Sequence, residues 1–284
     1  MNTPTTPTAA VIGWPIAHSR SPIIHNYWLK KYQLPGTYAK LPVPPEELAN
    51  FVGRLKKPPY LGCNVTLPHK EAILALVDGY DDRVARTGSA NTLYKENGSL
   101  LATSTDGPGF FANLKSSQPN YDPSGKPIVV LGAGGSAKAI VDELLRRGAD
   151  RIEVFNRTQS RAEAIVQRFG KQVTAVQAND FHASLSGAGL IINTTSAGLA
   201  NSDLLHIPME LLPQDCVVAD IVYTPLITPF LQQAQARQLA TVGGLGMLLH
   251  QAVVGFEKWF GVLPTVDEEL YDLVAADIQA GLGQ

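Results

Sequence analysis

The chain has 284 residues, of which 45% are hydrophobic and 17% are charged, and its formal net charge is −2 at pH 7. This composition is typical of a globular protein with room for one large domain or two ordinary ones. The charge balance argues against binding to nucleic acid or to an anionic membrane, and no apolar run reaches the roughly 18 residues that a spanning helix needs.

The N-terminal sequence and the two cysteines indicate the compartment in which the protein is expected. The first ten residues, MNTPTTPTAA, lack the basic region and apolar core of a secretory signal. Cys63 and Cys216 lie far apart in apolar stretches, so we expect buried free thiols in a reducing compartment. We therefore expect a cytoplasmic protein that acts on a small molecule as a monomer or homodimer.

The first 110 residues predict a small α/β domain. Three runs are typical of strands, and two helical segments lie between them. The strands are AAVIGW (9–14), TYAKLPV (37–43) and LGCNVT (61–66), and the helices are residues 21–32 and 44–55. Ser21 is the expected N-cap of the first helix, ahead of Pro22. A hairpin is predicted over 91–103, because Asn97-Gly98 favours the positive φ angles of a tight turn.

From residue 125 onward, short β-branched runs alternate with helical or loop stretches. They are IVVL (128–131), IEVF (152–155), VTAV (173–176), LIINTT (190–195), CVVADIV (216–222) and ATVG (240–243). Six strands separated by crossovers predict a doubly wound parallel sheet of the Rossmann type, with helices on both faces. Ser160 and Glu163 predict a capping box, and Gly170 is the expected end of that helix.

The C-terminal segments 245–261 and 267–282 predict two helices with no further strand. We expect them to return to the first domain. The predicted division is therefore an N-terminal α/β substrate-binding domain of residues 1–109 plus 246–284, and a nucleotide-binding domain of residues 110–245.

A glycine-rich loop follows the first strand of the second domain. In VLGAGGSAKAI (130–140), Gly132, Gly134 and Ala137 fit the pattern G-x-G-x-x-A. The first position permits a tight turn, the second lets the backbone approach a pyrophosphate, and the third lets helix and strand pack closely. The helix start offers unpaired N–H groups to anionic oxygens, so the expected contacts are Gly132, Ala133, Gly134, Gly135 and Ser136.

The end of the next strand indicates which dinucleotide binds. An NAD site needs an acidic residue there for the ribose 2′-hydroxyl, whereas this chain has FNRTQSR (155–161). Arg157 and Arg161, with Asn156 and Thr158, favour a 2′-phosphate. The alternative is that both arginines are solvated charges at a helix start, a place that is mildly unfavourable for a cation. We therefore predict NADP (NADPH).

Eight motifs resemble, in order, those of the shikimate dehydrogenases. They are GWPIAHSRSPIIHN, GCNVTLPHK, GSANTLY, TDGPGF, GAGGSAKA, NRTQSRAE, NTTSAG and GLGMLLHQA, and the resemblance runs from about residue 10 to the C-terminus. It implies reversible reduction of 3-dehydroshikimate to shikimate by NADPH. Spacing alone would indicate only an NADP-linked dehydrogenase.

The resemblance implies that Lys70 and Asp106 are catalytic and also contact the substrate. Interconversion of an alcohol and a ketone needs a group that shuttles the hydroxyl proton, and a lysine held by a carboxylate can do this. For an isolated PHK sequence, a surface lysine at a helix start would be the more ordinary interpretation. Asp106 can equally be a helix N-cap, which is compatible with catalysis.

Further substrate contacts are implied at Ser19, Ser21, Thr66, Asn91, Tyr223 and Gln251. Gln251 has independent support, because it shares a helix face with Met247 in an otherwise apolar segment. A buried glutamine must find partners, and a hydroxylated ligand would supply them. The alternatives are that Gln251 bonds to backbone in the core, that Ser21 only caps a helix and that Tyr223 is a core tyrosine.

The remaining implied residues surround the nicotinamide. They are Asp82, Thr194, Ile221, Gly244 and Met247, and Asp82 can equally be a solvated charge at a helix start. The six histidines form no ligand set, so we expect no metal. Three rivals stay open: a quinate/shikimate dehydrogenase of broader substrate or cofactor use, a methylene-tetrahydrofolate dehydrogenase and a non-enzymatic NADP-binding regulator.

Overall fold

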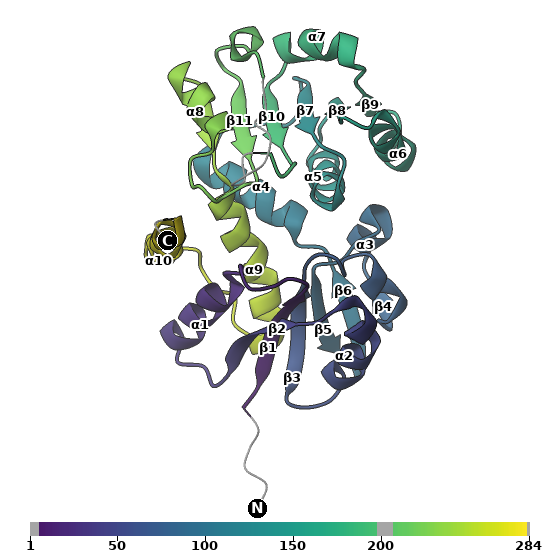
Figure 1. Ribbon diagram of the computed structural model, residues 1–284, viewed down its shortest axis with the longest axis vertical. Helices are drawn as coiled ribbons and strands as arrows, with labels where there is room; N and C mark the ends of the chain where they lie inside the picture. The colour runs from purple at the N-terminus through teal and green to yellow at the C-terminus, as the bar shows by residue number, and fades with distance from the viewer. Residues whose placement is uncertain (1–5, 198–206, 283–284) are drawn as a thin grey trace, which may run out of the picture. The chain divides into compact units, whose positions relative to one another are not determined.

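The computed structural model describes residues 6–197 and 207–282, and it divides the chain into two compact α/β units (Figure 1). Unit 1 consists of Met1–Thr105 and Gln251–Val274, and unit 2 of Asp106–His250 and Ala275–Gln284. The predicted class, two α/β domains, is confirmed. No helix within the described ranges is long and apolar enough to cross a membrane.

Unit 1 contains a six-stranded sheet with the order β2-β1-β3-β5-β6-β4. The strands are β1 (Thr8–Gly13), β2 (Thr37–Pro42), β3 (Tyr60–Val65), β4 (Gly79–Tyr80), β5 (Thr92–Glu96) and β6 (Ser99–Thr103). The first three strands are parallel, and β5 runs antiparallel to β3 and β6. The predicted hairpin is confirmed, since Asn97 and Gly98 have φ angles of 51° and 82°. The two-residue strand β4 was not predicted.

The helical segments of unit 1 that precede residue 105 are α1 (Ser21–Lys31), η1 (Pro45–Glu47), α2 (Leu48–Leu55), η2 (Ala72–Ala75) and α3 (Asp82–Thr87). The prediction that Ser21 caps α1 is wrong by one residue, because Arg20 is the N-cap and Ser21 is the first helical residue. The Ser19 hydroxyl oxygen accepts from the Ser21 backbone N–H at 3.4 Å, so a side chain further upstream serves the helix start.

Unit 2 contains the predicted parallel sheet, with the order β12-β11-β10-β7-β8-β9. The strands are β7 (Ile128–Leu131), β8 (Ile152–Phe155), β9 (Val173–Ala175), β10 (Leu190–Asn193), β11 (Val217–Asp220) and β12 (Ala240–Val242). Every neighbouring pair is parallel. The strand order reverses between β7 and β10, and ligands bind at the carboxyl edge beside such a reversal. The Rossmann-type prediction is confirmed.

Helices cover both faces of this sheet. On one face, α4 (Asp106–Ser117), α5 (Gly135–Arg146) and α6 (Gln159–Phe169) pack on the strands through Leu114, Ile140 and Ile165. On the other face are α7 (Phe181–Ser186) and α8 (Pro229–Ala236), with the short η4 (Met209–Leu211). The short η3 (Ala178–Asp180) leads into α7.

The predicted capping box of α6 is wrong. The helix begins at Gln159 with Thr158 as N-cap, and no side chain caps it. The Asn156 side chain donates to the Thr158 carbonyl at 2.8 Å, which closes the turn before Ser160 and leaves that serine inside the helix. Gly170 does end α6, with φ 86°.

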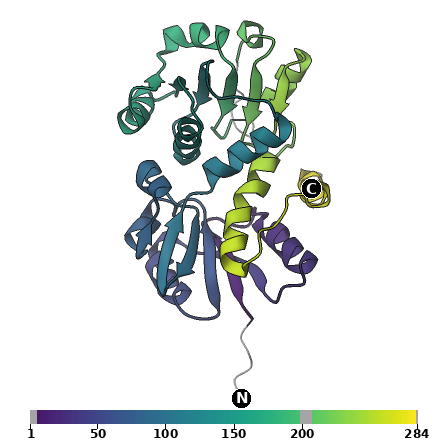
Figure 2. The same ribbon diagram turned by 180° about the vertical axis from the view of Figure 1, so that it is seen from behind.

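Helices α9 (Gly244–Phe260) and α10 (Glu268–Leu282) each begin in one unit and end in the other, and Figure 2 shows α9 from the side opposite to Figure 1. In unit 1, Trp259 donates its indole N–H to the Leu93 carbonyl at 2.9 Å, and Gly62 makes room for that ring. The expected return of the C-terminal helices to the first domain is confirmed for Gln251–Val274, whereas the end of α10 belongs to unit 2.

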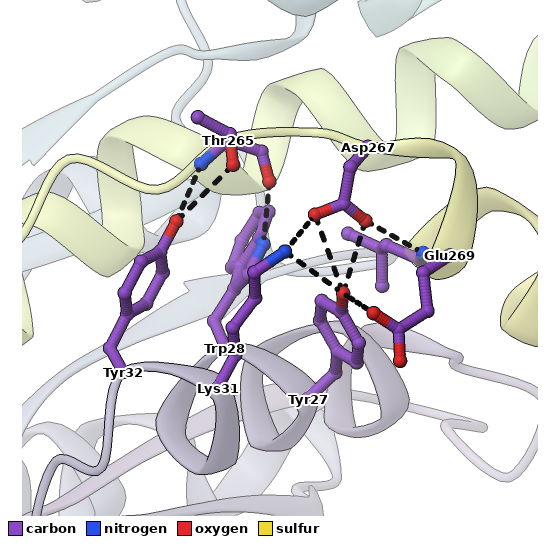
Figure 3. Close-up of polar contacts among 8 residues, drawn as sticks. Tyr27, Trp28, Lys31, Tyr32, Thr265, Asp267 and Glu269 are labelled. Carbon is purple, nitrogen blue, oxygen red and sulfur yellow. Dashed lines mark hydrogen bonds and ion pairs between the residues drawn. The ribbon is translucent and has the colours of Figure 1, made fainter.

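Polar side chains of α1 bind the segment between α9 and α10 and the start of α10 (Figure 3). The Trp28 indole donates to the Thr265 carbonyl at 2.9 Å, and the Tyr27 hydroxyl donates to Glu269 at 2.9 Å. Asp267 pairs with Lys31 and accepts from the Leu270 N–H at 2.9 Å, which caps α10. The helix that begins at Ser21 therefore also anchors the chain that follows Gln251.

Candidate active site

Three polar side chains from distant segments of unit 1 form one buried group. Asn91 lies just before β5, Thr105 follows β6 and Gln251 lies on α9; their exposures are 4%, 1% and 9%. The Asn91 amide donates to the Thr105 hydroxyl at 2.9 Å and to the Gln251 side-chain oxygen at 3.3 Å. The Thr105 backbone N–H donates to the Asn91 oxygen at 2.8 Å. Two residues predicted to bind substrate are thus neighbours in space.

Further buried hydrogen bonds connect this group to the sheet through Asn64, Thr92 and Tyr38. None of these three residues was predicted as a site residue. The Asn64 amide donates to the Asn91 carbonyl and to the Thr92 hydroxyl, both at 3.1 Å, and Tyr38 donates to the Asn64 oxygen at 2.6 Å. Burial raises the pKa of Tyr38 well above its ordinary value, while a hydrogen bond with Ser21 acts in the opposite direction. A chain of buried hydrogen bonds thus runs from the start of α1 to Asn91.

Lys70 and Asp106 adjoin this group along the backbone. The Ala90 N–H donates to the Lys70 carbonyl at 2.9 Å, and Ala90 is the residue before Asn91. Asp106, the first residue of α4, directly follows Thr105. Both side chains are half-buried. Thr105 therefore directly precedes Asp106, and Asn91 directly follows the residue whose N–H bonds to the Lys70 carbonyl.

His69, the residue before Lys70, has a structural role. His69 is buried, and its Nε2 lies 2.7 Å from the Val43 carbonyl oxygen, which can only accept, so that nitrogen carries the proton. This bond ties the segment that carries Lys70 to the end of β2. Among the described residues, no group of three or more His, Cys, Asp or Glu could hold a metal ion.

Ser19, Ser21 and Thr66 lie at the carboxyl side of the parallel strands of unit 1. The Ser19 hydroxyl donates to the Ser21 hydroxyl at 3.4 Å, so the two hydroxyls are adjacent. Thr66 continues β3, with its N–H donating to the Ile12 carbonyl at 2.9 Å. A Cβ on Gly13 would lie 2.5 Å from the Thr66 methyl group, so glycine at 13 leaves room for that threonine. Adjacent hydroxyls of this kind suit a carboxylate.

Helix α1 also carries a buried histidine, His25. His25 is fully buried, stacks on Tyr38 with ring centroids 4.0 Å apart, and lies in contact with Trp28 and Trp259. Neither ring nitrogen has a hydrogen-bond partner among the described residues. Burial lowers the pKa of His25 to about 3, while the Asn64 side chain acts in the opposite direction. The ring is therefore neutral at physiological pH.

In unit 2, the glycine-rich loop is the predicted pyrophosphate site. Gly132 has φ 107°, and a Cβ there would lie 2.7 Å from the Thr194 hydroxyl, so only glycine fits. Cβ atoms on Gly134 and Gly135 would meet no heavy atom within 4 Å, although any side chain would occupy the space above the start of α5. The first turn of α5 holds no acidic residue, so its N–H groups can face anionic oxygens.

The end of β8 also fits the predicted nucleotide. Arg157, Thr158 and Arg161 are exposed and surround the start of α6, and Asn156 is half-buried. No acidic residue occupies the first turn of α6. Two guanidinium groups with no carboxylate in this turn suit a ribose 2′-phosphate better than a 2′-hydroxyl. The residues present therefore fit NADP.

The predicted nicotinamide contacts of unit 2 lie in the loops that follow β10 and β11 and on the first turns of α9. Thr194 donates its hydroxyl to the Leu131 carbonyl at 2.7 Å, next to Gly132. A Cβ on Gly244 would lie 2.3 Å from the Ile221 carbonyl oxygen, so the start of α9 packs on the turn after β11. Met247 is buried in the core with Ala137, and Tyr223 is half-buried. Gly198, which ends the NTTSAG motif, lies outside the described residues.

The predicted site residues divide between the two units. Asp82 lies in unit 1, exposed at the start of α3, where Asp81 is the N-cap and accepts from the Val84 N–H at 3.0 Å. The other nicotinamide contacts and the phosphate loop lie in unit 2, as do Tyr223 and Asp106, whereas the remaining substrate residues lie in unit 1. Asp220, which ends β11, was not predicted, although a polar residue at the carboxyl end of a buried strand is a signal for it.

Comparison with protein-family models gives three matches that together span most of the chain. The shikimate dehydrogenase substrate binding domain matches residues 11–93, shikimate / quinate 5-dehydrogenase matches residues 115–245, and the shikimate 5′-dehydrogenase C-terminal domain matches residues 244–268.

Relatives match along almost the whole length of both chains. Shikimate dehydrogenase (NADP(+)) of Rhodopseudomonas palustris is 51% identical over 272 residues, which is 96% of each chain. The protein of the same name from Paracoccus denitrificans is 47% identical, with 95% of this chain and 96% of that one covered. Shikimate 5-dehydrogenase from Thermus thermophilus, solved in complex with NADP(H) and shikimate, is 35% identical with a TM-score of 0.85, covering 95% of this chain and 99% of that one. The chain belongs to the shikimate dehydrogenase family.

Proposed function

We propose that the chain catalyses the reversible, NADPH-dependent reduction of 3-dehydroshikimate to shikimate, in the pathway that leads to chorismate and the aromatic amino acids. The observation that carries the proposal is the buried pair Asn91–Gln251, whose members lie 160 positions apart in sequence and bond directly. Such a pair offers both donors and acceptors to a polyhydroxylated ring, a role that an apolar core position would not need.

Most of the proposed substrate contacts are residues of unit 1, whereas Tyr223 and Asp106 belong to unit 2. Ser19 and Ser21 hold the carboxylate through their hydroxyls, while Thr66, Asn91 and Gln251 bond to the ring hydroxyls, and Tyr223 lines the same site. Thr105 and Asn64 belong with this set, because each is buried and bonded to Asn91. We place the substrate-binding domain at residues 1–109 and 246–284, which is more than the compact unit Met1–Thr105 and Gln251–Val274.

Lys70 and Asp106 carry the proton chemistry. When bound, NADPH supplies the hydride that reduces the keto carbon. Lys70 donates a proton to the keto oxygen in the reduction and accepts it from the hydroxyl in the reverse reaction, and Asp106 holds the ammonium group in position. Both also hydrogen-bond to the substrate.

Residues 110–245 form the NADP-binding domain in this proposal. Gly132, Ala133, Gly134, Gly135 and Ser136 cradle the pyrophosphate, and Asn156, Arg157, Thr158 and Arg161 bind the adenosine end with its 2′-phosphate. Asp82, Thr194, Ile221, Gly244 and Met247 contact the nicotinamide end. Cys63 and Cys216 are both free and buried, which agrees with a reducing compartment, and we place the enzyme in the cytoplasm.

One assay separates the function from its rivals. NADPH absorbance is followed with 3-dehydroshikimate, with 3-dehydroquinate and with a methenyl-tetrahydrofolate in turn, and each productive assay is repeated with NADH. Turnover with 3-dehydroshikimate and NADPH is the expected result. Comparable turnover of the quinate-series substrate would favour the broader enzyme, and NADPH binding without turnover of any substrate would favour a regulator.

A further inference from the structure

A buried carboxylate ends strand β11 and accepts from three different segments. Asp220 is only 2% exposed. Its Oδ1 accepts from the Val222 backbone N–H and from the Asn193 side-chain amide, both at 2.9 Å, and its Oδ2 accepts from the Thr228 hydroxyl at 2.6 Å. The donors come from the end of β10, the turn after β11 and the N-cap of α8.

Two of these donor residues, Asn193 and Thr228, also make hydrogen bonds within their own segments. The Asn193 oxygen accepts from the Thr195 N–H at 3.0 Å and from its hydroxyl at 2.7 Å, and the Asn193 amide also donates to the Ala197 carbonyl at 3.1 Å. Thr228 accepts from the Leu231 N–H at 3.3 Å at the start of α8. One carboxylate therefore links the loop after β10 to the turn and helix after β11.

These segments carry the residues assigned to the nicotinamide end of the nucleotide. Ile221 lies inside the turn that the Asp220–Val222 bond closes, and Gly244 packs against its carbonyl. Thr194 lies in the loop that Asn193 holds, and its hydroxyl is in close contact with Gly132. A shift of the carboxylate would therefore move both sides of the carboxyl edge where open α/β sheets bind ligands.

We propose that Asp220 is a positioning residue for the nicotinamide half of the bound dinucleotide, acting through the two loops that it joins. The inference rests on the proposed function. Burial raises the pKa of Asp220 to about 6, while the bonds from Thr228, Val222 and Asn193 act in the opposite direction. Burial of a carboxyl group costs free energy, so packing alone does not explain why an aspartate occupies this position.

The test compares two ligands that differ in the nicotinamide end. NADPH binding is measured by fluorescence, and binding of 2′-phospho-ADP-ribose, which lacks the nicotinamide, by calorimetry. Asp220→Ala is expected to weaken NADPH binding about tenfold, the equivalent of one lost hydrogen bond to a charged group, and to leave the fragment unchanged. Asp220→Asn keeps an oxygen for Val222 and Asn193 and should bind NADPH nearly as the parent does.

Asp142→Asn is the matched control. Asp142 is 1% exposed, lies on α5 of the same unit and bonds to Arg146 at 2.8 Å. This variant should bind both ligands as the parent does. Equal losses for NADPH and the fragment in Asp220→Ala, or no loss for either, would overturn the inference.

A second pair of variants covers the case in which Asp220→Ala does not fold. Thr228→Val removes the donor to Oδ2 and should weaken NADPH binding selectively, whereas Thr228→Ser should restore it. If the serine variant restores nothing, or if valine changes both ligands alike, the positioning role is wrong. Failure of the parent protein to reduce 3-dehydroshikimate would reject the proposed function and leave these binding results interpretable.

Discussion

The side-chain amide of Asn91 donates to the side-chain oxygen of Gln251 across 3.3 Å in the interior of unit 1. Asn91 lies just before β5, whereas Gln251 lies on the helix that returns from the nucleotide-binding unit. In the proposed function, the substrate site therefore includes a residue of a helix that comes late in the chain. Its affinity for substrate should depend on how that helix is held.

Replacing Gln251 with Leu should raise the KM for shikimate about tenfold or more, because the variant loses an acceptor for Asn91 and a partner for a ring hydroxyl. Gln251→Glu keeps the acceptor oxygen and should be affected less. Steady-state kinetics with shikimate and NADP varied separately will distinguish substrate from nucleotide effects. Gln235→Leu, an exposed amide on α8, is the control. A leucine variant with an unchanged KM for shikimate would exclude Gln251 from the site.

Lys70→Ala should lower kcat by a factor of about 10² to 10⁴, the range that a positioned general acid contributes. NADPH binding should change little, because the nucleotide contacts lie elsewhere in the proposal. Lys30→Ala, which removes an exposed lysine on α1, should leave kcat unchanged. An unchanged kcat in Lys70→Ala would remove this lysine from the mechanism.

Much of the fold could be predicted because its signals are local. The strands Ile128–Leu131 and Ile152–Phe155 begin and end where their β-branched runs do, and the Asn97-Gly98 turn has the expected positive φ angles. Helix starts were less predictable. The caps at Ser21 and Ser160 were misplaced by one or two residues, because a hydrogen bond from a neighbouring side chain determines where each turn closes.

Site residues could be predicted where a sequence motif contains them. They could not be predicted where two residues become neighbours only because their strands pair. Asn64 and Thr92 are 28 residues apart and meet because β3 and β5 pair in that register. Asn193 and Asp220 meet in the same way across β10 and β11. Strand register depends on the whole sheet, so a polar residue inside a strand does not reveal its partner.

The two arginines at the start of α6 should decide nucleotide preference. Arg157→Ala combined with Arg161→Ala is expected to raise the KM for NADPH between about tenfold and a hundredfold, through loss of charge-assisted bonds to the 2′-phosphate. The KM for NADH should hardly change. Arg168→Ala, an exposed arginine in the last turn of the same helix, is the control. Equal effects on both nucleotides would mean that these side chains do not read the phosphate.

Gly246 is expected to be essential for packing in unit 2. A Cβ at this position would lie 1.8 Å from Oδ1 of Asn113, whose amide donates to the Gly243 carbonyl at 2.8 Å. Gly246→Ala should therefore cost about 1–3 kcal/mol in the free energy of unfolding. Gly53→Ala is the control, because a Cβ there meets nothing within 4 Å inside α2 and should stabilise the protein by about 0.5–1 kcal/mol. Urea unfolding compares the two, and a neutral Gly246→Ala would contradict the predicted clash.

The buried ring of His25 should make unit 1 sensitive to acid. Its folded pKa of about 3 lies below the ordinary value of 6.5, so the unfolded chain binds a proton that the folded chain does not. Stability contributed by the neutral ring is complete above pH 6.5 and is lost as the pH falls toward 3. Between pH 6.5 and pH 5 the loss is about 2 kcal/mol.

Asp220 should have the opposite effect in unit 2. Its pKa is raised from 3.8 to about 6, so the folded state holds the extra proton and stability falls as the pH rises from about 4 to 6. The parent protein therefore sums two opposing slopes, and single variants are needed to separate them. Asp220→Asn should remove this second slope and leave that of His25 in place.

His25→Phe keeps an aromatic ring against Tyr38 and removes the group that titrates. Urea unfolding of the parent and of this variant, at pH 5 and at pH 7, is the measurement. The variant should lose less stability on acidification than the parent, by about 2 kcal/mol. The same pH dependence in both proteins would mean that His25 does not titrate on unfolding. Because the histidine stacks on Tyr38, and Tyr38 bonds to Asn64, the variant also tests whether the ring supports the site: an unchanged KM for shikimate would restrict its role to stability.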